Sequence, residues 1–414
     1  MDVPQTEHYI RILEPPQAHP VPPAPVPGPV PAKPRPKYRR WRTAGVAGCV
    51  LAGAASLAVA DSPPPPVTPG FPLRVDAGSD LDAAAQASRA FLARWVDDDG
   101  RVVRRDQGND TVSEGQAYGM LIAVGVADQA RFESIWGWTR THLLRPDGLL
   151  AWRWAHGKVA DAEPAADADL DAARALVRAG AVFNRPDWTE SGVMLGRAVL
   201  GELTGWTGGS RVLLPGAWAT RDETSWYNPS YASPAAFAVL ARASGDPRWI
   251  ELDAGSRSVT QQLLQESPLP PDWALLNGKG VALPAAGPGS EGGKLQRYSY
   301  DAARVAVRLA ESCNSQDRSL SGMLAARLPS GSPLAAELSL SGSNLGTDRN
   351  PVAYVARASA FAAAGRPGKA RADLAEAATL NSAHPTYYGA AWLALGRLML
   401  ASPALGGCPP LAEP

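Results

Sequence analysis

The sequence has few of the residues that hold metals or staple small folds. Its 414 residues include three cysteines and five histidines, and the histidines are scattered along the chain. Cys313 and Cys408 could pair in an oxidising compartment, but two cysteines do not make a disulfide scaffold. We therefore expect a fold held together by its apolar core, since 45% of the residues are hydrophobic.

An excess of charge of one sign is also absent. Forty basic residues balance forty acidic ones, so the formal net charge is zero. Nucleic-acid binding depends largely on excess positive charge, and we therefore expect no nucleic-acid partner. The chain contains no Gly-x-Ser-x-Gly elbow, no phosphate loop, no dinucleotide fingerprint and no His-Glu-x-x-His motif. These absences argue against the chemistries that depend on those motifs.

The first 71 residues differ in composition from the remainder. Residues 1–43 are rich in proline and basic towards their end, which predicts a disordered leader. Residues 44–60 are small and apolar and end in Ala58-Val59-Ala60, which predicts a secretory signal and a periplasmic or secreted protein. At about 1.5 Å per residue the same run could just cross a bilayer uncleaved, so an inner-membrane anchor stays open. Residues 61–71 form a proline-rich linker, and we expect a catalytic domain over residues 72–414.

Helical periodicity dominates from residue 80 onward, where apolar residues recur at i, i+3 and i+4. The best strand candidates are Leu149–Trp154 and Arg211–Leu214. Twelve helices in successive antiparallel pairs can close into a double ring, and a superhelical stack is the structural alternative. The predicted helices are Leu81–Val96, Glu114–Ala127, Ala130–Leu143, Asp167–Val182, Asp187–Leu203, Pro234–Ala243, Pro247–Leu264, Tyr300–Ser312, Leu320–Ala326, Pro351–Ala364, Gly368–Leu380 and Pro385–Ala401.

Three short motifs place a carboxylate at a predicted helix start, beside aromatic residues or a close-packing glycine. They are Ser113–Met120, Ala166–Asp171 and Tyr298–Arg304. Carboxylates among aromatic rings suit the cleavage of a sugar–sugar bond, because one acid must protonate the leaving oxygen and one base must activate water. The thirteen tryptophans pack in the core or line an open cleft, since sugar rings offer apolar C–H faces.

Two of these acids have predicted neighbours on their own helix. Glu114 follows Ser113, the expected N-cap, and Tyr118 lies one turn on, beside Glu114. An acid in the first turn is also favoured by the helix dipole alone. Arg304, three residues after Asp301, could pair with it or hold a second carboxylate.

The third motif has an alternative as a metal site. Asp167, Asp169 and Asp171 are spaced like the first ligands of a calcium loop, but the glycine and distal glutamate of that loop are missing. We expect no metal and no cofactor. For Asp171 the favoured interpretation is a solvated residue near a helix start.

The three acid motifs and a series of further landmarks, taken in their order along the chain, resemble glycoside hydrolase family 8. The resemblance is greatest to the periplasmic endoglucanases encoded with bacterial cellulose synthases. The resemblance covers roughly residues 72–400. Its landmarks, in addition to the three acid motifs, are Ile135–Thr139, Gly148–Trp154, Leu213–Gly216, Ser225–Tyr231, Pro270–Trp273 and Tyr387-Tyr388. The chain departs from the family at Ala166, where serine or threonine is usual, and at Arg174, where a hydrophobic or small residue is usual.

The resemblance implies an all-α fold, the (α/α)6 double helical barrel, and a role for each acid. Glu114 takes the position of the proton donor and Asp301 that of the base. Asp167 takes the position that binds and distorts the sugar next to the cleaved bond. The side chains expected to bind substrate are Tyr118, Trp152, Trp154, Tyr231 and Arg304.

The implied activity is that of an endo-β-1,4-glucanase, a cellulase that cuts cellulose-like chains with inversion and supports bacterial cellulose biosynthesis. Chitosan, mixed-linkage glucan and xylan are alternative family substrates. A helical protein that binds glucan without cutting it is an alternative from another class. We expect a monomer whose partner is the polysaccharide, with the cellulose synthase complex as a further candidate.

Overall fold

The computed structural model describes residues 79–221, 223–288 and 295–412. The predicted leader, apolar segment and linker lie outside the described residues, so their assignment stays a prediction. In the described part, no helix has both the length and the apolar character needed to cross a membrane.

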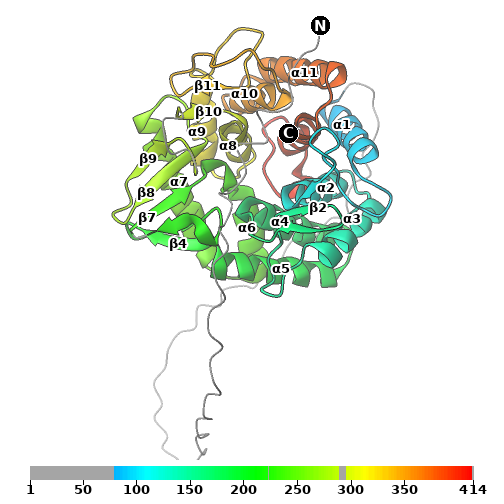
Figure 1. The fold of residues 1–414 in the computed structure, drawn as a ribbon. Coiled ribbons are helices and arrows are strands. Elements are labelled where there is room, and N and C mark those ends of the chain that lie inside the picture. The colour runs from blue at the N-terminus through cyan, green and yellow to red at the C-terminus, as the bar shows by residue number, and fades with distance from the viewer. Residues whose placement is uncertain (1–78, 222, 289–294, 413–414) are drawn as a thin grey trace, which may run out of the picture. The chain divides into compact units, whose positions relative to one another are not determined.

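Twelve α-helices in the described residues form two concentric rings (Figure 1). The six even-numbered helices are largely buried, and each contacts the next around the inner ring, with α12 returning to α2. This closed circuit is an (α/α)6 barrel, and it rules out the superhelical stack. The inner helices are α2 (Ser113–Gly125), α4 (Ala166–Val182), α6 (Pro234–Ser244), α8 (Tyr300–Ala310), α10 (Pro351–Ala363) and α12 (Tyr387–Ala401). The outer helices are α1 (Asp80–Trp95), α3 (Gln129–His142), α5 (Pro186–Glu202), α7 (Arg248–Glu266), α9 (Ser315–Leu324) and α11 (Pro367–Ala383).

Small residues allow the inner helices to pack closely. A Cβ at Gly125 of α2 would lie 2.6 Å from the Leu398 side chain of α12. A Cβ at Gly396 of α12 would lie 2.2 Å from Val355 of α10. Both distances are below van der Waals contact, so a side chain at either position would push two inner helices apart.

The twelve predicted helices are confirmed, with boundaries that shift by a few residues. The predicted N-cap at Ser113 is wrong: α2 begins at Ser113 itself, and Val112 occupies the N-cap position without a side-chain hydrogen bond. Helix α12 begins at Tyr387 rather than Pro385. The strand expected over Leu149–Trp154 forms only over Arg153–Ala155, whereas the Arg211–Leu214 strand is found over Ser210–Leu213.

Short strands in the loops of the described residues form four small antiparallel sheets. The largest has the order β6-β7-β8-β9 and packs on its own apolar cluster, which includes Tyr227, Val259 and Leu276. Tyr227 of β7 pairs with Ala274 of β8. The strands are β1 (Thr111–Val112), β2 (Arg153–Ala155), β3 (Lys158–Asp161), β4 (Thr204–Thr207), β5 (Ser210–Leu213), β6 (Thr220–Arg221), β7 (Thr224–Tyr227), β8 (Trp273–Asn277), β9 (Ala282–Ala285), β10 (Arg297–Tyr298) and β11 (Leu338–Ser339).

Ion pairs bridge α4 and the α8 segment at three successive levels inside the barrel. Asp167 pairs with Arg304 at 2.7 Å, Asp171 pairs with Arg308 at 2.6 Å, and Arg174 pairs with Glu311, just past the end of α8, at 2.6 Å. All six side chains are at most 3% exposed. The expectation that Asp171 is solvated is therefore wrong, because Arg308 donates to both of its carboxylate oxygens in the core.

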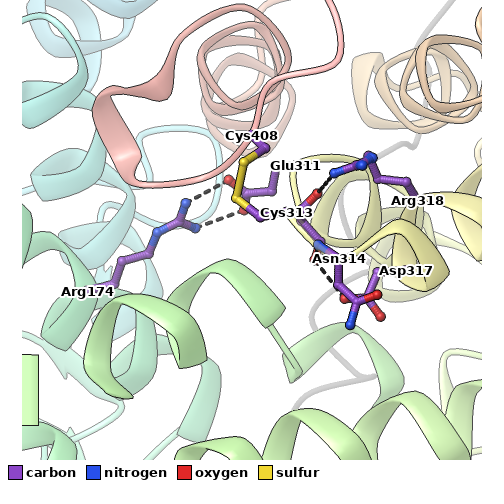
Figure 2. Close-up of a disulfide and its surroundings, with 8 residues drawn as sticks. Arg174, Glu311, Cys313, Asn314, Asp317, Arg318 and Cys408 are labelled. Carbon is purple, nitrogen blue, oxygen red and sulfur yellow. Dashed lines mark hydrogen bonds and ion pairs between the residues drawn. A yellow bond between two sulfur atoms is a disulfide. The ribbon is translucent and has the colours of Figure 1, made fainter. Parts of the chain in front are cut away.

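The lowest of these ion pairs is joined to the C-terminal segment. Figure 2 shows Arg174 reaching both oxygens of Glu311 beside the disulfide between Cys313 and Cys408. The Nε of Arg174 also donates to the Leu405 carbonyl at 2.9 Å. The unusual arginine at this position thus has a structural partner on both α8 and the segment that follows α12.

Candidate active site

Glu114 lies in the first turn of α2, where the chain leaves strand β1. Its Oε1 accepts a hydrogen bond from the Trp152 indole nitrogen at 3.3 Å. Desolvation and, to a smaller extent, the negative charge of Asp167 raise the pKa of Glu114 to about 7, against the opposing effects of a backbone hydrogen bond, Arg104 and Arg304. A carboxyl group with this pKa is protonated for much of the time near neutral pH, as a general acid must be.

Asp167 lies in the first turn of α4 and is 2% exposed. Arg304 of α8 donates to its Oδ2 at 2.7 Å. Burial raises the pKa of Asp167, while the charge and the hydrogen bond of Arg304 counteract this effect. Ala165 occupies the N-cap position of α4, so the start of this helix has no side-chain cap.

Asp301, in the first turn of α8, is the more accessible of the two aspartates that Arg304 contacts. Its side chain is 28% exposed, compared with 2% for Asp167. Arg304 donates to Oδ1 at 2.6 Å, and the Asn228 amide donates to Oδ2 at 3.0 Å. Asp301 thus has both a fixed orientation and access to solvent, which are the requirements of a base that must take a proton from water.

Arg304 connects these carboxylates from the centre of the barrel. It is 3% exposed and donates to Asp167, to Asp301 and to the Tyr118 hydroxyl at 3.1 Å. Both roles predicted for Arg304 are therefore present together. One guanidinium shared by two carboxylates, with Glu114 in the same electrostatic environment, leaves the site with excess negative charge.

The aromatic residues predicted to bind substrate are placed differently from one another. Tyr231 packs on Arg304 with 5.3 Å from the guanidinium carbon to the ring centroid, and Tyr118 is buried against Trp392. Trp152 reaches Glu114, whereas Trp154 packs edge-on against Trp138 and His142. The structure thus brings Trp152, Tyr118, Tyr231 and Arg304 to the acids, and gives Trp154 mainly packing contacts in the adjoining loop.

Sequence reasoning assigned no role to Asn228 or Asp272, although both stand inside its landmark motifs. Asn228 follows β7 and orients the base through its amide, while its Oδ1 accepts from the Ser230 backbone and hydroxyl. Asp272 precedes β8 and accepts hydrogen bonds from Ser299 and Ala302 at the start of α8. The polar residues in these motifs were the available signal for a role in the site. The partners of Asn228 and Asp272 could not be named, because they lie 73 and about 30 residues away in sequence.

Among the described residues, no cluster of three or more histidine, cysteine, aspartate or glutamate side chains has the geometry to hold a metal ion. Asp169, the middle acid of the calcium-like spacing, instead accepts a hydrogen bond from the Leu150 backbone at 2.7 Å. The three acids of this motif therefore have three separate protein partners, Arg304, Leu150 and Arg308.

Comparison with curated proteins gives relatives with consistent names. The chain is 38% identical over 230 residues to a "Probable endoglucanase" of Novacetimonas hansenii, a match that covers 54% of this chain and 66% of that protein. It is 33% identical over 230 residues to the "Endoglucanase" of Escherichia coli (strain K12), covering 52% of this chain and 59% of that protein. Each match spans less than two thirds of the relative's own length.

Solved structures match a larger share of the chain. The endo-β-1,4-glucanase CMCax from Acetobacter xylinum has a TM-score of 0.62 at 29% identity, covering 77% of this chain and 98% of that one. The endoglucanase Cel10 from Klebsiella pneumoniae, described as a family 8 glycosyl hydrolase, has a TM-score of 0.65 at 25% identity, covering 76% and 98%. The family model described as "Glycosyl hydrolases family 8" matches residues 77–401, which is most of the chain. The chain therefore belongs to glycosyl hydrolase family 8.

Proposed function

We propose that this protein is an inverting endo-β-1,4-glucanase that hydrolyses internal bonds of cellulose-like chains. The observation that carries the proposal is the gathering of three acids with distinct environments around one buried arginine. Glu114 has a pKa raised to about 7, Asp167 is buried in an ion pair, and Asp301 is open to solvent. The names of the similar proteins support glucan as the substrate.

In this proposal Glu114 and Asp301 carry out the two proton transfers of hydrolysis. The Glu114 carboxyl donates its proton to the glycosidic oxygen as the bond from that oxygen to the anomeric carbon breaks. A water molecule attacks the anomeric carbon from the opposite face, and Asp301 accepts the proton that this water loses. The two carboxyl groups end with their protonation states exchanged, and one proton transfer through solvent restores them.

Asp167 and Arg304 have supporting roles in the same scheme. Asp167 is held by Arg304 and stays within electrostatic reach of Glu114, so its negative charge adds to desolvation in keeping the proton on the acid. That charge also lies where the positive charge of an oxocarbenium-like transition state would develop. Arg304 holds Asp301 and Asp167 at fixed positions relative to each other.

We propose export to the periplasm or the outside of the cell, with support of cellulose biosynthesis as the physiological role. The disulfide between Cys313 and Cys408 supports an oxidising compartment. Retention in the inner membrane through residues 44–60 is the alternative, and the cellulose synthase complex is the candidate partner. Amino-terminal sequencing of exported protein that begins near Asp61 would support cleavage, and recovery of an intact leader in the membrane would support the anchor.

The activity is tested with full-length protein on carboxymethylcellulose, mixed-linkage glucan, xylan and chitosan in parallel. We expect reducing ends to appear on carboxymethylcellulose with an early fall in viscosity, which marks internal cleavage, and no loss of rate after chelation. Binding of glucan without cleavage would support the non-catalytic alternative. A clear preference for chitosan or xylan would change the substrate assignment and leave the reaction type intact.

A further inference from the structure

Asp272, which lies outside the three acid motifs, holds the start of the helix that carries the base. Its Oδ1 accepts hydrogen bonds from the backbone nitrogens of Ser299 at 2.8 Å and Ala302 at 2.9 Å. Its Oδ2 accepts a hydrogen bond from the Ser299 hydroxyl. Ser299 occupies the N-cap position of α8 but caps none of its backbone groups with its own side chain. Asp272 therefore supplies the cap from a remote part of the chain.

The end of the four-stranded sheet that carries Asp272 also carries Asn228, which contacts the base directly. Asp272 directly precedes β8, Asn228 directly follows β7, and Tyr227 pairs with Ala274 across these two strands. Asn228 donates to the Asp301 carboxylate, and Asp272 fixes the backbone on both sides of Asp301. The sheet therefore fixes both the side chain and the backbone of the base.

A charged group is an unfavourable choice for a helix cap at this position. Desolvation and the nearby negative charge of Asp301 raise the pKa of the Asp272 carboxyl to about 7, although the hydrogen bonds from Ser299 and Ala302 counteract them. A serine hydroxyl at the N-cap position could cap α8 without that repulsion, yet the hydroxyl of Ser299, which stands there, donates to Asp272 instead. Unlike a local cap, Asp272 connects the start of α8 rigidly to the sheet.

We propose that Asp272 is a positioning residue for catalysis, which orients Asp301 by anchoring the start of α8 to the β6–β9 sheet. This inference rests on the proposed glucanase function with Asp301 as the base. Asp272 has no direct role in the chemistry, and its effect on the rate passes through Asp301.

The test compares Asp272→Ala with Asp272→Asn, using cellopentaose as the substrate. Alanine removes all three hydrogen bonds, and we expect kcat to fall about 10²-fold with KM nearly unchanged, because a small displacement of the base is enough for such a loss. Asparagine has the same shape, can accept both backbone hydrogen bonds through its oxygen and can donate to the Ser299 hydroxyl. We therefore expect Asp272→Asn to restore kcat to within about tenfold of the wild type.

Asn314→Ala is the matched control, since it removes the cap of the outer helix α9 and contacts none of the acids. We expect it to lower Tm as a lost cap does while leaving kcat unchanged. If Asp272→Ala does not fold, Ser299→Ala removes a single one of the three bonds, and we expect kcat to fall about threefold. An unchanged kcat in Ser299→Ala would then contradict the proposal.

The same substitution made in the Asp301→Asn variant distinguishes a positioning role of Asp272 from a general loss of stability. In Asp301→Asn protein, measured on an aryl cellobioside with a good leaving group, adding Asp272→Ala should change the residual rate by less than about threefold, because the base is already lost. A further loss of about 10²-fold there, or a wild-type kcat in Asp272→Ala, would overturn the proposal. Wild-type protein that cleaves no glucan would instead overturn the proposed function together with this inference.

Discussion

Ion pairs join α4 to α8, or to Glu311 just past its end, at three levels of the barrel. The level at the active site differs from the two below it. At the lower levels each guanidinium has a single carboxylate partner, Asp171 with Arg308 and Glu311 with Arg174. At the upper level Arg304 is shared between Asp167 and Asp301, with Glu114 close enough for its pKa to respond.

This difference separates structural from catalytic use of the same residue types. In a buried one-to-one pair the opposite charges balance, so its main contribution is to fix the helices in register. A site with more carboxylates than cations favours the protonated form of one of them. Desolvation, together with the excess of negative charge at the upper level, lets Glu114 keep the proton that hydrolysis needs.

Removing the acid tests the upper level most strongly. Because general acid catalysis contributes roughly 10²–10⁴-fold to a rate, we expect Glu114→Gln to reduce cleavage of carboxymethylcellulose by that factor. Glucan binding should survive, as measured by calorimetry with cello-oligosaccharides. The same variant should lose much less on an aryl glycoside with a good leaving group. More than about a tenth of wild-type activity on the polymer would remove Glu114 from this role.

Breaking a lower pair should affect stability instead of chemistry. Arg174→Leu leaves Glu311 buried without its cation, and we expect a loss of about 3–5 kcal/mol in the free energy of unfolding. The double variant with Glu311→Leu should recover most of that loss, because replacing both ions by apolar side chains is often neutral. Denaturant unfolding measures both effects. Equal destabilisation by the single and the double variant would show that the Leu405 contact, not the ion pair, holds this region.

The pH dependence of kcat/KM tests whether Glu114 keeps its proton near neutral pH. Glu114 must be protonated, and its pKa is about 7, so activity should be retained below this pH and fall about tenfold per unit above it. Fits of rate against pH for a neutral cello-oligosaccharide give the value. An alkaline limb near the ordinary glutamate pKa would contradict the electrostatic account of this site.

Trp152→Phe should have the smallest effect of these changes. The indole donates a 3.3 Å hydrogen bond to Glu114, which favours the ionised form. Its loss should raise the pKa of Glu114, so the alkaline limb should move to higher pH by less than about one unit. A shift to lower pH in the same rate measurements would mean that Trp152 acts mainly by excluding water from the acid.

The sequence predicts the local features of this molecule well and its long-range pairings poorly. Periodicity is a local signal, and all twelve helices were found from it. The acids were found because each stands at a helix start beside an informative neighbour. Asp171 was misjudged because its partner, Arg308, lies 137 residues away. Arg174 departs from the family pattern, and its partner Glu311 could not be named from the sequence because it is equally remote.

The β6–β9 sheet was missed for a related physical reason. Its strands have only two to five residues, so no periodic signal marks them, and the central pairing of β7 with β8 joins segments about fifty residues apart. Asn228 and Asp272 could not be given roles without that sheet, because their contacts with α8 exist only once β7 and β8 are paired.

The anomeric form of the first product tests the central claim most directly. If Glu114 is the acid and Asp301 is a base acting on water, cleavage of a β-1,4-glucan releases the α-anomer first. Proton NMR of cellopentaose hydrolysis, followed from the first minute before mutarotation, would detect it. An initial α-anomer is the predicted result. An initial β-anomer would mean that Asp301 attacks the sugar itself, and it would contradict the account in which Glu114 is the acid and Asp301 is a solvent-accessible base.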